Sequence, residues 1–558
     1  MDIASLIETT FESTQFTKLD TGETKAFIKD GRLFVPPKLL HQLSYESLKN
    51  LSFFLRKSHL SLMIDQYKKD ESSENDKLVI GTLLQNAIVS AKGDLALCQD
   101  TGTAVIYGWK SESIFTGVDD EKILSSGIKD VYQDCFLRAS QTAPSSFFDE
   151  YNTEDNLPGQ ISLFAVKDSK RGPSYRFLFA AKGAGSSNKT SYFPMTKALL
   201  EESRFETFLK EQIQALGCAA CPPYRIAIVI GGASPEINLE ILKLATTEIL
   251  DTAPAFAEKE HADEARNKGW IRRDTYWEKR VMEIGKACGL GAQFGGTSLL
   301  LDAKVLRMPR HAASCPVSIG VSCSAHRNIL AEINQDGIFI ETLEKNPAEL
   351  LKAKGLDSLI LQSEKKQDNI DVLIPRVNLN QSMKEIQSAL SQFSAGDKMY
   401  LSGKILVARD AAHLEWHNLI TCGKDLPEYL YHHPIFYAGP AATPLGKIMG
   451  SMGPTTAQRM DVYAGELMSR GIALVTLAKG NRSAAWAAAC KTYQGFYLGT
   501  IGGAAALFAE KNIVHDEVID YPELGMEAVR LIEIKDVPAF VITDNKGNDL
   551  YEIIKNNV

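Results

Sequence analysis

A short polar stretch, Cys98-Gln99-Asp100-Thr101-Gly102-Thr103-Ala104, concentrates groups that could do chemistry. Cysteine is a ligand for iron–sulfur clusters and soft metals, and the carboxylate of Asp100 can exchange a proton. Gly102 lets backbone N–H groups approach an anion closely. A buried cysteine before an Asp-Thr-Gly turn explains this stretch equally well when it is taken alone. Other motifs must therefore distinguish a metal site from a turn.

Nine cysteines are scattered over the 558 residues. An odd number in a long chain does not indicate a disulfide framework. Cys218 and Cys221 form a C-x-x-C pair, but no second Cys or His pair follows at zinc-site spacing. Cys315 and Cys323 lie in residues 309–327, a segment that also holds two histidines and two arginines. Such a segment is too rich in reactive side chains for a plain core strand.

Residues 182–190, Lys182-Gly183-Ala184-Gly185-Ser186-Ser187-Asn188-Lys189-Thr190, approach the phosphate-binding pattern G-x-x-x-x-G-K-[ST]. Asn188 replaces the second glycine, and no strand ending in a magnesium-binding Asp is evident. A cradle for carboxylates would use the same backbone N–H groups. Residues 289–296 likewise miss the dinucleotide pattern G-x-G-x-x-G, because Phe294 stands at the third glycine. These patterns favour an anion site over an ATPase or a Rossmann domain.

Apolar spacing predicts the elements that must position these residues. It predicts a helix at 123–140 that carries Arg138, and strands at 161–166, 175–181 and 225–230. Ser234 and Pro235 predict the cap and first turn of a further helix. A polar segment predicts a linker at 346–370, between an N-terminal domain (1–345) and a strand-rich second domain (371–558). A chain of this length needs more than one core, and we expect an α/β fold.

Composition narrows the function classes. The net charge of −8 and the isoelectric point near 5.8 argue against nucleic acid and against anionic membranes as partners. No apolar run reaches the roughly 18–20 residues of a membrane span. The acidic start, Met1-Asp2-Ile3-Ala4-Ser5, lacks the basic segment of a signal peptide. We therefore expect a cytoplasmic location.

Taken together, the motifs resemble those of class I, iron–sulfur-dependent fumarate hydratases, and the resemblance runs nearly end to end. The motifs that carry it are Cys98–Ala104, Ala181–Thr190, Ala220–Tyr224, Gly289–Gly296, Gly320–Ala325, Gly453–Thr456, Ala478–Ser483 and Tyr521–Ala528. The resemblance implies an N-terminal α/β cluster-binding domain followed by a C-terminal swivelling α/β domain.

The resemblance also implies a [4Fe–4S] cluster held by Cys98, Cys221 and Cys323. Three protein ligands leave one iron open, which can act as a Lewis acid on substrate oxygens. Cys315 and Cys323 lie eight residues apart, so strand alternation cannot choose between them. Cys323 ends the apolar run, and the family motif Gly-Val-Ser-Cys ends there. We therefore expect Cys323 to be the third ligand.

By the same resemblance, the site residues lie on both sides of the linker, so the site is expected between the domains. The catalytic residues would be Asp100, Thr455 and His311. The substrate-binding residues would be Gln99, Asp100, Arg138, Gly185, Asn188, Lys189, Thr190, Arg409, Thr455, Thr456, Arg459 and Lys479. In the hypothetical mechanism, Asp100 protonates the leaving hydroxyl of malate and Thr455 removes the C3 proton. The arginines hold the carboxylates.

The implied activity is reversible hydration of fumarate, a small dicarboxylate, to (S)-malate by a homodimer. Alternatives are a related hydro-lyase acting on mesaconate or tartrate, and a cluster-bearing sensor or binding protein without turnover. The intact Asp100, Thr455 and Lys479 argue against the sensor. The chain departs from the family pattern at Ala184, Ala312, His326, Ala408 and Gln458. Gln458, between Thr455 and Arg459, is the departure best placed to alter substrate fit.

Overall fold

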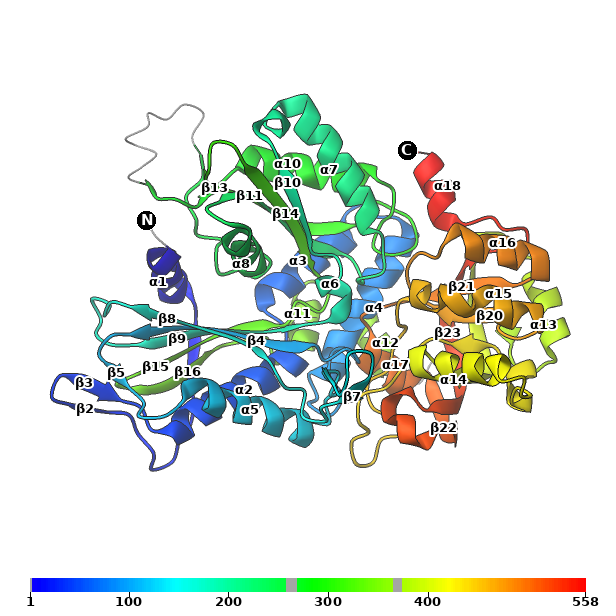
Figure 1. Ribbon diagram of the computed structural model, residues 1–558, viewed down its shortest axis with the longest axis horizontal. Helices are drawn as coiled ribbons and strands as arrows, with labels where there is room; N and C mark the ends of the chain where they lie inside the picture. The colour runs from blue at the N-terminus through cyan, green and yellow to red at the C-terminus, as the bar shows by residue number, and fades with distance from the viewer. Residues whose placement is uncertain (1–2, 257–267, 365–373, 558) are drawn as a thin grey trace.

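The N-terminal part of the computed structural model, which describes residues 3–256, 268–364 and 374–557, contains two large sheets (Figure 1). In spatial order, the six-stranded sheet consists of β1 (Phe16–Lys18), β16 (Gly337–Glu341), β15 (Asn328–Asn334), β9 (Tyr175–Lys182), β4 (Thr103–Ser111) and β8 (Gln160–Val166). The five-stranded sheet consists of β10 (Ser191–Met195), β14 (Cys315–Ser322), β11 (Tyr224–Gly232), β13 (Leu300–Arg310) and β12 (Arg272–Arg273). Two small sheets lie outside them. One consists of β2 (Phe27–Lys29), β3 (Arg32–Phe34) and β5 (Ile114–Phe115), and the other consists of β6 (Thr142–Pro144) and β7 (Glu150–Asn152).

Helices cover both sheets and separate them (Figure 1). Alternate residues of β4 pack on opposite sides of the six-stranded sheet. Ala104 and Ile106 belong to one core, and Val105 and Tyr107 belong to another. The first core includes α2 (Pro37–Phe53) and α5 (Asp120–Asp134), and the second includes α1 (Ile3–Ser13) and α8 (Pro235–Ala245). The outer face of the five-stranded sheet packs on α7 (Glu202–Leu216) and α10 (Thr275–Ala287). Both sheets are therefore buried on two faces.

The C-terminal part is a seven-stranded sheet that closes on itself. Its strands are β17 (Arg376–Asn378), β18 (Lys398–Val407), β19 (Ile435–Phe436), β20 (Val475–Ala478), β21 (Phe496–Thr500), β23 (Val529–Thr543) and β22 (Ile513–Asp520). Strand β23 pairs with both β21 and β18, which joins the two ends of the parallel run β18–β21. Closure gives β18, β19, β20, β21 and β23 a neighbour on both sides, whereas β17 and β22 remain end strands. The helices of this part are α13 (Met383–Leu390), α14 (Asp410–Thr421), α15 (Asp461–Ser469), α16 (Ala484–Tyr493), α17 (Ala505–Lys511) and α18 (Leu550–Asn556).

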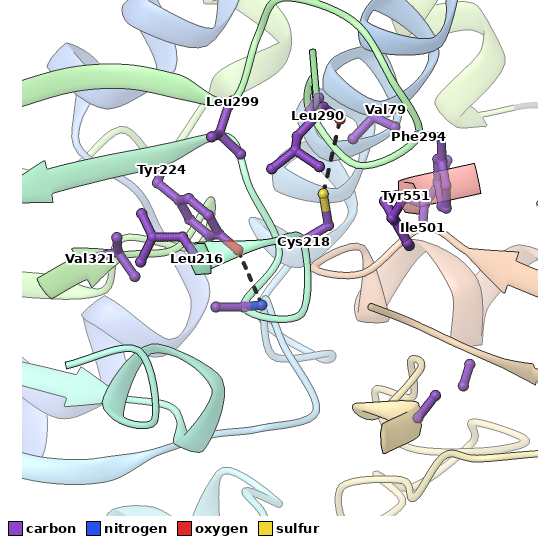
Figure 2. Close-up of a cluster of buried hydrophobic side chains, with 14 of the residues drawn as sticks. Val79, Leu216, Cys218, Tyr224, Leu290, Phe294, Leu299, Val321, Ile501 and Tyr551 are labelled. Atoms are coloured by element: carbon purple, nitrogen blue, oxygen red, sulfur yellow. Dashed lines mark hydrogen bonds between the residues drawn. The ribbon is translucent and has the colours of Figure 1, made fainter. Parts of the chain in front are cut away.

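The two parts share one hydrophobic core, which Figure 2 shows around Cys218. Val79 of α4 (Glu74–Ser90) and Ile501 and Tyr551 of the C-terminal part belong to it. The Cys218 thiol donates to the Leu290 carbonyl (3.9 Å), and burial raises the pKa of this thiol. Cys218 is therefore a core residue, and the two parts are packed firmly enough to build a site between them.

Several predicted elements are confirmed, but the predicted C-terminal end of one helix is wrong. Strands β8, β9 and β11 lie where apolar alternation predicts them, and the Ser234 hydroxyl caps α8 by accepting from the Ile237 N–H. Helix α5 ends at Asp134, so Arg138 lies in the following loop rather than in a helix. Phe136 has a left-handed φ of 53°, which a continuing helix does not allow. None of the described helices has the length and apolar character that a bilayer-spanning segment requires.

The expected linker is largely helical. Helices α11 (Pro347–Ala353) and α12 (Asp357–Glu364) occupy its first part, and both pack on α4. Leu351, Leu356 and Leu359 are buried there, which explains why this polar segment folds. Residues 365–370 of the expected linker lie outside the described residues.

Candidate active site

The stretch that begins at Cys98 lies in the loop between α4 and β4, where the two parts meet. The side chains of Cys98 and Gln99 are buried. The Gln99 Nε2 donates to the Pro454 carbonyl (3.2 Å), and the Ser451 hydroxyl donates to the carbonyl of Ala96 (2.6 Å). Contacts from the C-terminal part therefore fix this stretch in the interior, whereas a surface turn would face water.

Cys98, Cys221 and Cys323 come together at this boundary. Arg225 of β11 pairs with Ser322 of β14, which brings the segments before β11 and after β14 to the same end of the sheet. The Ser324 N–H donates to the Cys221 carbonyl (3.1 Å). Burial, together with the charges of Cys221 and Cys323, raises the pKa of Cys98 to about 11. The three sulfur atoms are therefore close enough to influence one another's ionisation.

Cys315 lies elsewhere. It begins β14, is fully buried, and pairs with Met195 of β10. Eight strand residues span about 26 Å, so Cys315 and Cys323 lie at opposite ends of the strand. The structure therefore groups Cys323, and not Cys315, with Cys98 and Cys221.

The three cysteines suit a cluster better than a single ion. In the parts of the chain that the structure describes, no three His, Cys, Asp or Glu side chains form a group that could hold one metal ion. Thiolate ligands of a [4Fe–4S] cluster each bind a different iron, so they need not converge on one point. A Cβ added to Gly502 would lie 2.6 Å from the Cys221 sulfur, and one added to Gly503 would lie 2.7 Å from Ser324 Oγ. The two glycines keep open a cradle that side chains would fill.

Two cations support ionised thiols in this cradle. The Lys479 Nζ donates to Cys221 Sγ (2.7 Å), and although burial lowers the pKa of Lys479, the Cys221 thiolate raises it overall. Arg327 is 5% exposed, and its Nε has no hydrogen-bond partner among the described residues. Burial opposes its charge, but Cys98 and Cys323 raise the pKa of Arg327. Because metal-bound thiols are deprotonated, both cations favour a bound cluster.

Asp100 lies beside the cysteines in a ring of donors. Its Oδ2 accepts from the Ala184 N–H (2.8 Å), and Arg138 lies 3.7 Å from its Oδ1. Burial raises the pKa of Asp100, but the charges of Arg138, Arg327 and Lys479 outweigh it, so the pKa lies below its ordinary value. The carboxylate is therefore ionised at neutral pH and able to accept a proton.

Arg138 and Arg409, from different parts of the chain, lie side by side. An Arg138 nitrogen donates to the Gly439 carbonyl (3.3 Å), and a Cβ on Gly439 would lie 3.2 Å from Arg409 Nη1. Burial and the charge of Arg409 lower the pKa of Arg138 to about 10. Glu527 contacts the Arg409 guanidinium and also accepts from the Ala411 N–H (2.9 Å). Two guanidiniums this close favour a bound carboxylate.

Thr455 lies next to Lys479 and holds Arg459. Its carbonyl accepts from the Lys479 N–H (3.2 Å), and its Oγ1 accepts from an Arg459 nitrogen (2.6 Å). Arg459 also lies 3.2 Å from Asp410, and Thr456 forms a β-bridge with Lys479. A cationic donor stabilises negative charge on the threonine oxygen, which is what a proton acceptor needs.

The segment at residues 182–190, here called the Gly-rich loop, reaches Asp100 only at its start, through Ala184. Further along, Asn188 and Thr190 are exposed, and in the described part of the chain neither forms a hydrogen bond with Asp100. The Lys189 Nζ donates to the Ala215 carbonyl (3.3 Å). Gly185 packs against Ala220, directly before Cys221. Within one chain, the first residues of this loop therefore lie beside the Asp100 carboxylate, whereas Asn188, Lys189 and Thr190 do not.

His311 is not brought to the other predicted residues within one chain. It lies exposed in the turn between β13 and β14, and its Nδ1 accepts from the Ala313 N–H (3.2 Å). This turn lies at the end of β14 opposite Cys323. A catalytic role for His311 stays a prediction that the geometry of one chain does not support.

Arg327 and Glu527 are site contributors that the sequence analysis did not single out. Arg327 ends the segment 309–327, whose density of reactive side chains was the available signal. Glu527 lies in the family motif Tyr521–Ala528, but nothing in its spacing indicates that it meets Arg409. Both contacts join residues far apart in the chain.

Comparison with known proteins identifies the family of this chain. The family described as Fumarate hydratase (Fumerase) matches residues 41–332, and its partner, Fumarase C-terminus, matches residues 337–554. The anaerobic class I fumarate hydratase of Escherichia coli (strain K12) is 45% identical over 98% of this chain and 96% of its own. The chain belongs to the class I fumarate hydratase family. Fumarate hydratase 2 of Leishmania major is 44% identical over 96% of this chain and 91% of its own.

The departures from the family pattern leave the cysteines and the cations of the site unchanged. His326 is buried, its Nδ1 shares a hydrogen bond with the Ser322 hydroxyl (2.8 Å), and its Nε2 lies 3.4 Å from Glu248. Burial lowers the pKa of His326 well below its ordinary value, so it serves as a neutral core residue. Gln458 is exposed beside Arg459.

Proposed function

We propose that this hydro-lyase adds water reversibly to fumarate and gives (S)-malate. The observation that carries the proposal is the pair Arg138 and Arg409 beside an ionised Asp100 and three neighbouring cysteines. A four-carbon dicarboxylate needs cations for its carboxylates and a proton-transfer group at its middle, and these residues supply both. Membership of the class I fumarate hydratase family supports the same substrate.

We propose that Cys98, Cys221 and Cys323 hold a [4Fe–4S] cluster. When bound through three cysteines, such a cluster has one open iron, which supplies Lewis acidity toward a water or hydroxyl oxygen. Lys479 and Arg327 favour the ionised form of the thiols, although burial alone raises the pKa of Cys98 and Cys221, and Gly502 leaves room beside Cys221.

The protein's own groups account for binding and proton transfer. Arg138 and Arg409 hold one carboxylate, and Lys479, which donates to Cys221, adds positive charge near Asp100. In hydration, the ionised Asp100 accepts a proton from water, and in dehydration it returns that proton to the leaving hydroxyl. Thr455, polarised by Arg459, exchanges the proton at C3. Gln99, Arg138 and Cys98 are buried beside these groups, whereas the Asp100 side chain is 23% exposed.

Turnover by anaerobically purified protein tests this proposal. Fumarate, mesaconate and tartrate are each supplied, and product formation is followed by coupled absorbance while iron and sulfide per chain are measured. We expect the highest kcat/KM with fumarate. A preference for mesaconate or tartrate would make the protein a related hydro-lyase, and an intact cluster without turnover on any of the three would make it a sensor.

We also propose a homodimer with a C-terminal part that can swivel, because the family resemblance implies both, and we keep the expected cytoplasmic location as a proposal. None of them follows from the contacts of a single chain. Light scattering on the purified protein measures the mass, and a value of one chain would contradict the dimer.

A further inference from the structure

A cavity of about 280 Å³ lies between the Gly-rich loop and α8, apart from the candidate active site. Its polar lining consists of Lys182, Ser186, Ser187, Thr190, Lys243 and Thr246. None of the three cysteines lines it, and neither does Asp100. The loop that approaches a phosphate-binding pattern in sequence therefore faces this cavity with three hydroxyls.

The charge in this cavity is uncompensated. The Lys182 Nζ donates to Thr246 Oγ1 (2.6 Å), and the Lys243 Nζ donates to Gln160. Among the described residues, neither lysine forms an ion pair with a carboxylate. Burial lowers the pKa of Lys182 to about 8. The charge of Cys323 opposes this shift, and the charge of Lys243 adds to it. Two ammonium groups without a counter-charge are costly to enclose, and an anion would relieve that cost.

We propose that this cavity binds a small oxygen dianion, either inorganic phosphate or a dicarboxylate distinct from the one that reacts. Each lysine keeps N–H donors beyond the one it uses, and the serine and threonine hydroxyls add further donors. The volume of about 280 Å³ is ample for a small dianion. The site therefore selects by charge.

The cavity shares its loop with the active site. The helix α6 (Ala184–Ser187) donates its Ala184 N–H to Asp100, while its Ser186 and Ser187 line the cavity. An anion bound to these serines would restrain the loop that supplies a hydrogen bond to Asp100. The inference goes beyond the proposed function, because binding here requires no turnover.

Calorimetric titration of the full-length, anaerobically purified protein tests the proposal. Inorganic phosphate is one arm. Malonate is the other, measured in the Arg409→Ala background so that the substrate site is impaired. We expect one saturable site per chain in at least one arm. Binding of phosphate would identify the inorganic ion, and binding of malonate alone would identify a dicarboxylate.

Matched variants locate the site. Lys243→Met should weaken binding about tenfold or more, whereas Lys243→Arg should stay within about threefold of the unchanged protein. Lys197→Met removes an exposed lysine outside the cavity and should leave binding unchanged. Ser187→Ala alters only an exposed hydroxyl and should weaken binding about threefold, which keeps the test valid if Lys243→Met folds poorly.

Three results would overturn the proposal. They are absence of saturable binding in both arms, equal weakening by Lys197→Met and Lys243→Met, and phosphate binding that disappears in Arg409→Ala but survives in Lys243→Met. The last result would place the anion in the substrate site. Fumarate turnover is measured separately, so failure of the anion site and failure of the proposed function are distinguishable.

Discussion

Replacing Arg409 by alanine tests whether the paired guanidiniums bind the substrate. The Arg409 side chain is only 13% exposed, contacts Glu527, and lies against Arg138 across Gly439. Truncating one partner of a buried charge pair costs about 2–5 kcal/mol. Because about 1.4 kcal/mol is tenfold, kcat/KM for fumarate should fall about 30- to 4,000-fold.

The assay combines fumarate turnover with iron and sulfide per chain, because Arg409→Ala should keep its cluster. Arg376→Ala is the matched control, since Arg376 also pairs with a carboxylate, Asp536, but lies on β17 away from the site. It should keep full activity. If Arg409→Ala retained kcat/KM within about threefold, or lost its iron while folded, the assigned role of Arg409 would be wrong.

Three further changes test the neighbouring groups. Asp100→Asn keeps an oxygen for the Ala184 N–H but cannot accept a proton, so turnover should fall about 10²–10⁴-fold with the cluster retained; loss of the cluster instead would contradict this. Arg327→Met should weaken iron retention against a chelator about 10–100-fold, with Arg327→Lys intermediate, and unchanged retention would exclude a supporting role. Gly502→Ala places a Cβ 2.6 Å from the Cys221 sulfur and should lower iron and sulfide per chain, whereas Gly465→Ala, which meets nothing within 4 Å, should not.

Local patterns predicted several strands and the start of one helix, because the cause of each lies in the local sequence. Apolar runs fix β9 and β11 because both strands are buried between layers, and Ser234 with Pro235 fixes the start of α8 because a cap satisfies its free N–H groups. The nomination of Cys98, Cys221 and Cys323 came from family motifs, and the structure adds their proximity.

The remaining features depend on contacts between distant segments. Closure of the C-terminal sheet requires β23 to pair with both β18 and β21, and no local pattern encodes that. Arg138 lies outside a helix because Phe136 adopts a left-handed φ. Phenylalanine rarely adopts that conformation, so the sequence does not predict the turn. No local sequence pattern assigns a role to Arg327. Its role becomes evident only from its burial among Cys98, Cys323 and Asp100.

Iron and acid-labile sulfide per chain, measured in anaerobically purified Cys323→Ser and Cys315→Ser, test the central claim most directly. The claim is that a cluster bound by Cys98, Cys221 and Cys323 lies at the boundary between the two parts. Cys323→Ser should contain little cluster and no fumarate hydration, while Cys315→Ser should keep both with a modest loss of stability, because Cys315 is fully buried at the far end of β14. Full iron and sulfide in Cys323→Ser, with their loss in Cys315→Ser, would contradict the account.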